Sequence, residues 1–164
     1  MGFLHHLREE HDAIKSRLDT LERGLEAFGQ GKDADLEGLH ELAEQLMQRT
    51  LPGHLHEMHV LGRRLADHGE QPRATAEALH GAGETVLDIG QRLLEHLDDA
   101  SEDVVVPRDR LPEIGREFAN VTRKQLQREE RELFACAEHV LTAAEWRQLA
   151  AHAITDGQDG AHAR

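Results

Sequence analysis

Residues 4–28 read LHHLREEHDAIKSRLDTLERGLEAF, and this stretch decides the fold. Apolar residues recur in it every three or four positions, which is the spacing of one stripe along an amphipathic α-helix. The stripe consists of Leu4, Leu7, Ile14, Leu18, Leu21, Leu25 and Phe28. Its only polar position is His11, and the sequence Gly29-Gln30-Gly31 then predicts the end of the helix.

The same periodicity predicts three more long helices, over residues 35–67, 73–97 and 112–141. In the first of these, Pro52 and Gly53 predict a kink because proline removes a helical hydrogen bond. Residues 69–72 read as a loop, and residues 98–109 as a connection with a short extended piece before Pro107. Thr142 and Glu145 match a capping box, which predicts a short fifth helix to about residue 149.

Together these elements predict a single all-α domain over residues 1–154. Long helices joined by short connections favour an antiparallel four-helix bundle, here with a short C-terminal helix. The small, polar residues 155–164 predict a disordered tail.

Composition excludes several classes of protein. The chain has 164 residues and a formal net charge of -13, whereas a nucleic-acid-binding protein needs clustered Lys and Arg. A single cysteine excludes a disulfide framework and a thiolate zinc cluster. Neither a secretory signal nor an apolar run long enough to span a membrane is evident. We therefore expect a cytoplasmic protein that contacts neither nucleic acid nor membrane.

Polar residues on the apolar stripes mark the candidate site. His11 interrupts the first stripe, and His54 lies on the stripe of residues 35–67. His80 lies beside the apolar stripe of the third helix, while Gln125 and Glu129 fall in line with the fourth. Buried imidazoles and carboxylates need one another or a cation, because an unpaired buried polar group costs about 1–3 kcal/mol. Such a donor set suits iron, zinc or manganese.

Four segments of the chain, taken in order, resemble the hemerythrin-like family, also called the HHE cation-binding domain. They are LREEHDAI at 7–14, LPGHLHEM at 51–58, Leu79-His80, and QLQREERELF at 125–134 followed by LTAAEW at 141–146. The resemblance implies a four-helix bundle with a non-haem di-iron centre. It also implies binding or sensing of oxygen, nitric oxide or iron, or action on peroxide.

Two positions depart from the ligand pattern of that family. Met58 stands four residues after His54, where the family usually has a carboxylate, and Gln125 stands four residues before Glu129, where it usually has a histidine. A reduced ligand set can still hold one or two cations: His11, His54, Glu57, His80, Glu84 and Glu129. The alternative is a metal-free descendant with a polar core.

The sequence therefore supports two hypotheses. The first is a bundle that binds non-haem iron or another divalent cation and uses it to bind or sense oxygen, nitric oxide or redox state, rather than to turn over a substrate. The second is a metal-free bundle that acts as an interaction or regulatory module. A diatomic ligand fits the first hypothesis, and a protein partner or a homodimer fits either.

Overall fold

The computed structural model describes residues 2–102 and 107–159, and every long element in these ranges is helical. The bounds of the elements are α1 Gly2–Gly29, α2 Leu36–Gln45, η1 Leu46–Thr50, α3 Leu51–Ala66, α4 Glu70–Ser101, α5 Arg110–Arg128, η2 Glu129–Phe134, α6 Ala135–Val140 and α7 Ala143–Asp159. The elements η1 and η2 are single π-helical turns, so that α2 continues through η1 into α3 and α5 continues through η2 into α6.

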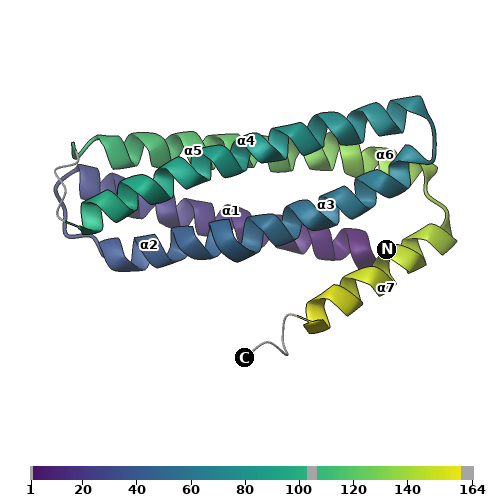
Figure 1. The fold of residues 1–164 in the computed structure, drawn as a ribbon, viewed down its shortest axis with the longest axis horizontal. Helices are drawn as coiled ribbons and strands as arrows, with labels where there is room; N and C mark the ends of the chain where they lie inside the picture. Colours follow the sequence, from purple (N-terminus) through teal and green to yellow (C-terminus); the bar gives the residue numbers. More distant parts are fainter. Residues whose placement is uncertain (1, 103–106, 160–164) are drawn as a thin grey trace.

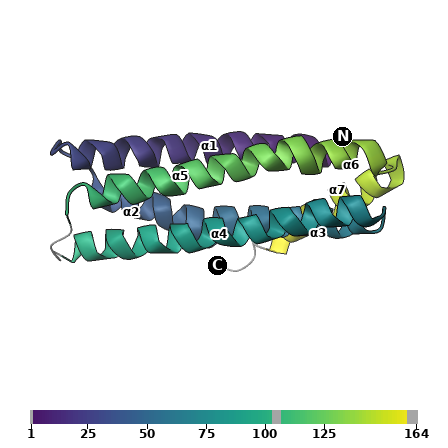
Figure 2. The same cartoon turned by 90° about the horizontal axis from the view of Figure 1, so that it is seen from above.

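The long helices lie side by side and form a helical bundle (Figures 1 and 2). Helix α1 packs on α5, and α4 packs on α2, α3 and α5. Helix α7 turns away after α6 and contacts the ends of α1 and α3. Within the described part of the chain, no helix combines the length and the apolar character that a membrane crossing requires.

The apolar core consists of two clusters with a polar layer between them. Along α1, Leu4 and Leu7 belong to one cluster and Ile14 and Leu18 to the other, and His11 separates them. The same sequence of apolar, polar and apolar residues occurs on two other helices. On α3, His54 lies between Leu51 and Met58. On the continuous helix formed by α5, η2 and α6, Glu129 lies between Leu126 and Leu133.

The π turn η1 accommodates Pro52. Proline has no N–H to donate to the helical ladder, and its ring clashes with the carbonyl four residues earlier. Just before it the hydrogen-bond pattern widens, because the N–H of Leu51 donates to the carbonyl of Leu46. The hydroxyl of Thr50 also donates to the carbonyl of Gln45 over 3.3 Å. The sequence predicted a kink here, and the structure places a π turn at this point.

Both ends of α4 differ from the sequence prediction. The expected loop at residues 69–72 is shorter, because α4 already begins at Glu70. Gly69 has φ 118°, a conformation that favours glycine, and Pro72 fits the first turn of α4, where its missing N–H has no helical partner to lose. Helix α4 also continues to Ser101, beyond the predicted end at residue 97, while the predicted extended piece at 104–106 lies outside the described residues.

The C-terminal helix begins as predicted. Glu145 accepts hydrogen bonds from the N–H and the hydroxyl of Thr142, and the N–H of Glu145 lies 3.4 Å from that hydroxyl, which completes the capping box. Helix α7 is longer than expected and reaches Asp159, past the start of the predicted disordered tail, so residues 155–159 are helical. Residues 160–164 of that tail lie outside the described part of the chain.

Candidate metal centre

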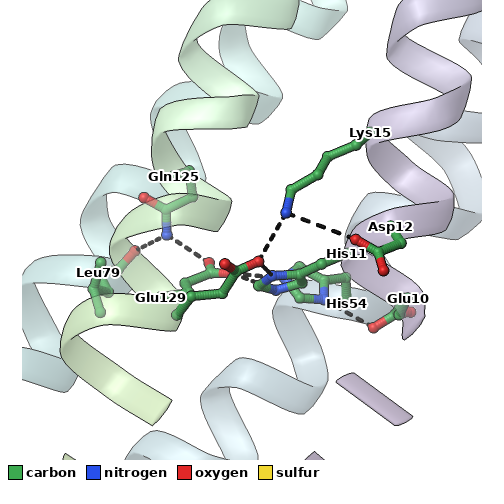
Figure 3. Close-up of polar contacts among 9 residues, drawn as sticks. Glu10, His11, Asp12, Lys15, His54, Leu79, Gln125 and Glu129 are labelled. Carbon is green, nitrogen blue, oxygen red and sulfur yellow. Dashed lines mark hydrogen bonds and ion pairs between the residues drawn. The ribbon is translucent and has the colours of Figure 1, made fainter. Parts of the chain in front are cut away.

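Three of the residues that the sequence singled out meet in the polar layer. The side chains of His11, His54 and Glu129 are 0%, 1% and 1% exposed, and they come from α1, α3 and η2 (Figure 3). The Nε2 atom of His54 lies 2.8 Å from Oε2 of Glu129, and Nε2 of His11 lies 3.2 Å from the same oxygen. Two imidazoles and one carboxylate therefore converge on one point of the core.

Each imidazole is held from behind by a carboxylate. Nδ1 of His11 lies 2.8 Å from Oε1 of Glu130, and Nδ1 of His54 lies 2.8 Å from Oε2 of Glu10. A carboxylate accepts hydrogen bonds, so it fixes the proton on Nδ1 and leaves Nε2 to face inward. Histidines that ligate metals are commonly oriented by such carboxylates.

Glu129 is also held in place by a neighbour on its own helix. The Nε2 amide of Gln125 donates to Oε1 of Glu129 over 2.7 Å and to the backbone carbonyl of Leu79 over 3.0 Å (Figure 3). Gln125 is thus the residue that orients the carboxylate and ties α5 to α4.

Contacts within the cluster shift two pKa values strongly. Burial opposes the positive charge of His54, but its hydrogen bonds to Glu10 and Glu129 and the charges of these groups outweigh burial and raise its pKa to about 9. Burial likewise opposes ionisation of Glu129, yet its contacts with His11, His54 and Gln125 lower its pKa to about 2. Without a metal, His54 and Glu129 thus form an imidazolium–carboxylate pair at neutral pH.

Among the described residues, one ring nitrogen of the centre has no hydrogen-bond partner. Nε2 of His11 is fully buried and, although close to Glu129, is not oriented to donate to it or accept from it. Buried polar atoms nearly always have a partner, so an orphaned one calls for an explanation. A cation between the three side chains supplies one, because the imidazole nitrogens and the carboxylate oxygen all lie within 4.8 Å of one another.

The other predicted ligands lie elsewhere. His80 and Glu84 are exposed, because the buried face of α4 is formed by their neighbours Leu79 and Gly83. One residue along an α-helix turns the side chain by about 100°, which carries both groups away from the core. In this structure neither side chain is one of the three that meet in the centre.

Glu57 joins a different group. It lies 3.4 Å from Nε2 of His6, and one of its carboxylate oxygens lies within 4.8 Å of one of Glu10. Burial and the nearby charge of Glu10 raise the pKa of Glu57, despite the opposing effect of His6 and His54. Its Oε2 atom is buried and has no hydrogen-bond partner in the described residues.

The supporting carboxylates Glu10 and Glu130 were not predicted from the sequence. Each directly adjoins a residue of the centre in the chain, and that adjacency is the signal that could have found them. Glu130 also forms an ion pair with Lys15, whose Nζ lies 2.9 Å from Oε1 of Glu130. Two neighbours therefore hold this carboxylate in position. These contacts lower the pKa of Glu130 against the opposing effect of partial burial.

A cavity of about 330 Å³ between α3 and α4 leads to the centre. Its lining is mainly apolar and includes Met58, Leu79 and Leu133, and it reaches Glu129. His59 and His80, whose ring centroids are 5.3 Å apart, are exposed lining residues of the same cavity. His80 thus borders the approach to the centre.

Comparisons of the chain with protein-family models, curated proteins and solved structures gave no match. The hemerythrin-like resemblance therefore stays a prediction.

Proposed function

We propose that this protein is a divalent-cation-binding helical bundle of the hemerythrin-like kind, with its helices in an antiparallel four-helix arrangement. The cation is held by Nε2 of His11, Nε2 of His54 and a carboxylate oxygen of Glu129. The observation that carries the proposal is the buried Nε2 of His11, which has no hydrogen-bond partner among the described residues. It lies beside His54, whose Nδ1 is bonded to Glu10, and beside Glu129, whose Oε1 accepts a hydrogen bond from Gln125. Two imidazoles and a carboxylate suit Fe²⁺ or Zn²⁺, and iron is the metal that the resemblance implies.

The proposed role is to bind or sense a small molecule. Three protein ligands leave coordination positions open on a metal that takes four to six ligands, and an open position is where an exogenous ligand binds. The cavity between α3 and α4 gives a small apolar molecule such as oxygen or nitric oxide a route to Glu129. When bound, iron supplies the reversible coordination of that molecule. The protein orients the imidazoles through Glu10 and Glu130, and surrounds the centre with apolar residues.

A metal-free regulatory or interaction module is the second candidate. The observation that favours it is the 2.8 Å ion pair between His54 and Glu129, which satisfies both groups without a cation. This candidate predicts that metals leave the stability of the chain unchanged. It also predicts that His11→Ala behaves as an ordinary core truncation.

Metal binding and thermal unfolding distinguish the two candidates. Chelator-treated protein is loaded anaerobically with Fe²⁺, desalted and analysed for iron, and its melting temperature is measured with and without metal. A metal at 100 times its dissociation constant stabilises the folded state by about 2.7 kcal/mol, which raises the melting temperature of a chain of this size by about 5–10 °C.

His11→Ala and His54→Ala remove this effect, and each variant retains one iron fewer than the wild type. His139→Ala serves as the control, because His139 is an exposed histidine of α6 and is not one of the three proposed ligands. If neither iron nor zinc raises the melting temperature, or if His139→Ala reduces metal binding as much as His11→Ala does, the proposed centre does not exist.

A further inference from the structure

The group formed by His6, Glu10 and Glu57 has the composition of a second cation site. His6 and Glu10 are four residues apart on α1, so they share one face of the helix, and Glu57 approaches them from α3. One potential ligand atom from each of the three side chains lies within 4.8 Å of the other two. One imidazole and two carboxylates form a donor set suited to Zn²⁺, Mn²⁺ or Fe²⁺.

The charges and hydrogen bonds of this group are incomplete. Glu10 and Glu57 bring two carboxylates together, and the half-exposed His6 lies 3.4 Å from Glu57. His54, the other neighbour, donates to Glu10 and pairs with Glu129. Oε2 of Glu57 is buried, although 23% of the side chain is exposed, and it has no hydrogen-bond partner among residues 2–102 and 107–159. A bare carboxylate oxygen in this position is what a cation would complete.

We propose that His6, Glu10 and Glu57 bind a second divalent cation at the edge of the bundle. This site does not require the His11–His54–Glu129 centre to be occupied. The two sites share one link, because Glu10 accepts a hydrogen bond from Nδ1 of His54 while it serves as a ligand of the outer site. The carboxylate that orients a histidine of the inner centre is thus itself a ligand of the outer cation.

That link makes the two sites unequal and coupled. A cation on Glu10 withdraws negative charge from its hydrogen bond with His54, and two nearby dications repel each other. The second equivalent of metal therefore binds more weakly than the first. Replacing Glu10 by Gln weakens both sites, whereas changes at His6 or Glu57 weaken the outer site alone.

A neighbouring pair on the same helix provides a matched control. His5 and Glu9 have the same spacing as His6 and Glu10 and lie 3.4 Å apart, but their side chains are 74% and 67% exposed. Within the part of the chain that the structure describes, no third His, Asp, Glu or Cys joins them as a potential ligand. If a helical His–Glu pair sufficed to bind metal, the two pairs would behave alike. If the site needs Glu57, only the pair of His6 and Glu10 binds.

Calorimetric titration of the chelator-treated full chain with Zn²⁺ tests the site. The wild type is expected to show two classes of zinc binding. We expect His6→Ala and Glu57→Gln each to lower the affinity of the weaker class by at least about 100-fold. Loss of a residue that only supports a metal ligand lowers the affinity by no more than about 100-fold. His5→Ala leaves both classes intact. His11→Ala abolishes the tighter class and leaves the outer one, so failure of the inner centre is recognised separately.

Two results overturn the outer site. One is that His6→Ala and Glu57→Gln leave the weaker class of zinc binding unchanged, while His11→Ala removes the tighter class. The weakly bound zinc would then lie on other surface histidines. The other is equal loss in His5→Ala and His6→Ala. His6 is half exposed, with 52% of its side chain accessible, so His6→Ala tests binding without disturbing the core.

Discussion

Replacement of Glu129 by Gln tests the electrostatics of the polar layer in the metal-free protein. The amide has the shape of the carboxylate, and it can keep the hydrogen bond from Gln125. It removes the negative charge 2.8 Å from Nε2 of His54. The variant therefore isolates the charge of Glu129 from the packing around it.

The expected cost follows from the raised pKa of His54. An imidazole with a pKa of about 9 in the folded protein and about 6.5 in the unfolded chain adds about 3 kcal/mol to the free energy of unfolding at pH 7. Two carboxylates, Glu10 and Glu129, oppose burial and raise this pKa. Loss of one of them should thus lower the free energy of unfolding by about 1–2 kcal/mol at pH 7.

The pH dependence gives the prediction its direction. Because the folded pKa of His54 is raised, its contribution is complete below about pH 6.5 and disappears as the pH rises through about 9. The difference between wild type and Glu129→Gln should therefore shrink between pH 7 and pH 10. Groups that titrate alike in both proteins cancel in this difference.

Urea unfolding of chelator-treated wild type and variant, at pH 7 and at pH 10, measures the effect. Glu132→Gln is the control, because Glu132 lies on the same π turn and is 43% exposed in an ion pair with Arg128. Such a surface pair contributes about 0–1 kcal/mol. A loss in Glu129→Gln that is no larger than in Glu132→Gln, or that is the same at both pH values, would refute the reasoning.

Three further predictions concern single side chains. Glu57→Gln should raise the melting temperature of the metal-free protein at neutral pH. The reason is that the pKa of Glu57 is raised in the folded state, so its negative charge opposes folding above that pKa. An unchanged or lower melting temperature contradicts this prediction. Gln125→Leu should lower the free energy of unfolding by about 1–3 kcal/mol in urea, since it leaves a buried carbonyl and Glu129 without a donor. Thr142→Ala should cost about 1 kcal/mol by the same assay. The lowered pKa of Glu145, about 2, predicts that the contribution of this cap persists above pH 4.5 and is lost as the pH falls towards 2, which Trp146 fluorescence can follow.

The helical class could be predicted because the apolar period is unbroken along most of the chain. The stripe of α1 from Leu4 to Leu25 is buried at every apolar position, and His11 is buried with it. Boundaries were harder to predict where a residue has two roles. Pro72 marks loops and first helical turns alike, and only the conformation of Gly69 shows that α4 begins before it.

The site could be predicted only in part. His11, His54 and Glu129 interrupt apolar stripes, so that the sequence already places them in the core. His80 and Glu84 each follow directly after a buried residue of α4. The apolar pattern places the buried face only to within one residue, and one residue turns a side chain by about 100°, so the pattern cannot tell whether these two side chains face the core or the solvent. The partners Glu10 and Glu130 depend on contacts between helices, which no periodicity within one helix reveals.

The π turn at Glu129–Phe134 has a consequence for how this helix can change. A π turn is the local equivalent of one inserted residue, and it rotates all that follows by about 100° relative to an uninterrupted α-helix. Glu129 is the first residue of the turn and follows directly from α5, while Phe134, its last residue, and Ala137 and Leu141 beyond it belong to the apolar cluster that also includes Leu149 of α7. The face of the helix that carries Glu129 and the face that packs against α7 are thus set separately. Deleting one residue within the π turn would rotate the C-terminal end about the helix axis and leave the position of Glu129 unchanged.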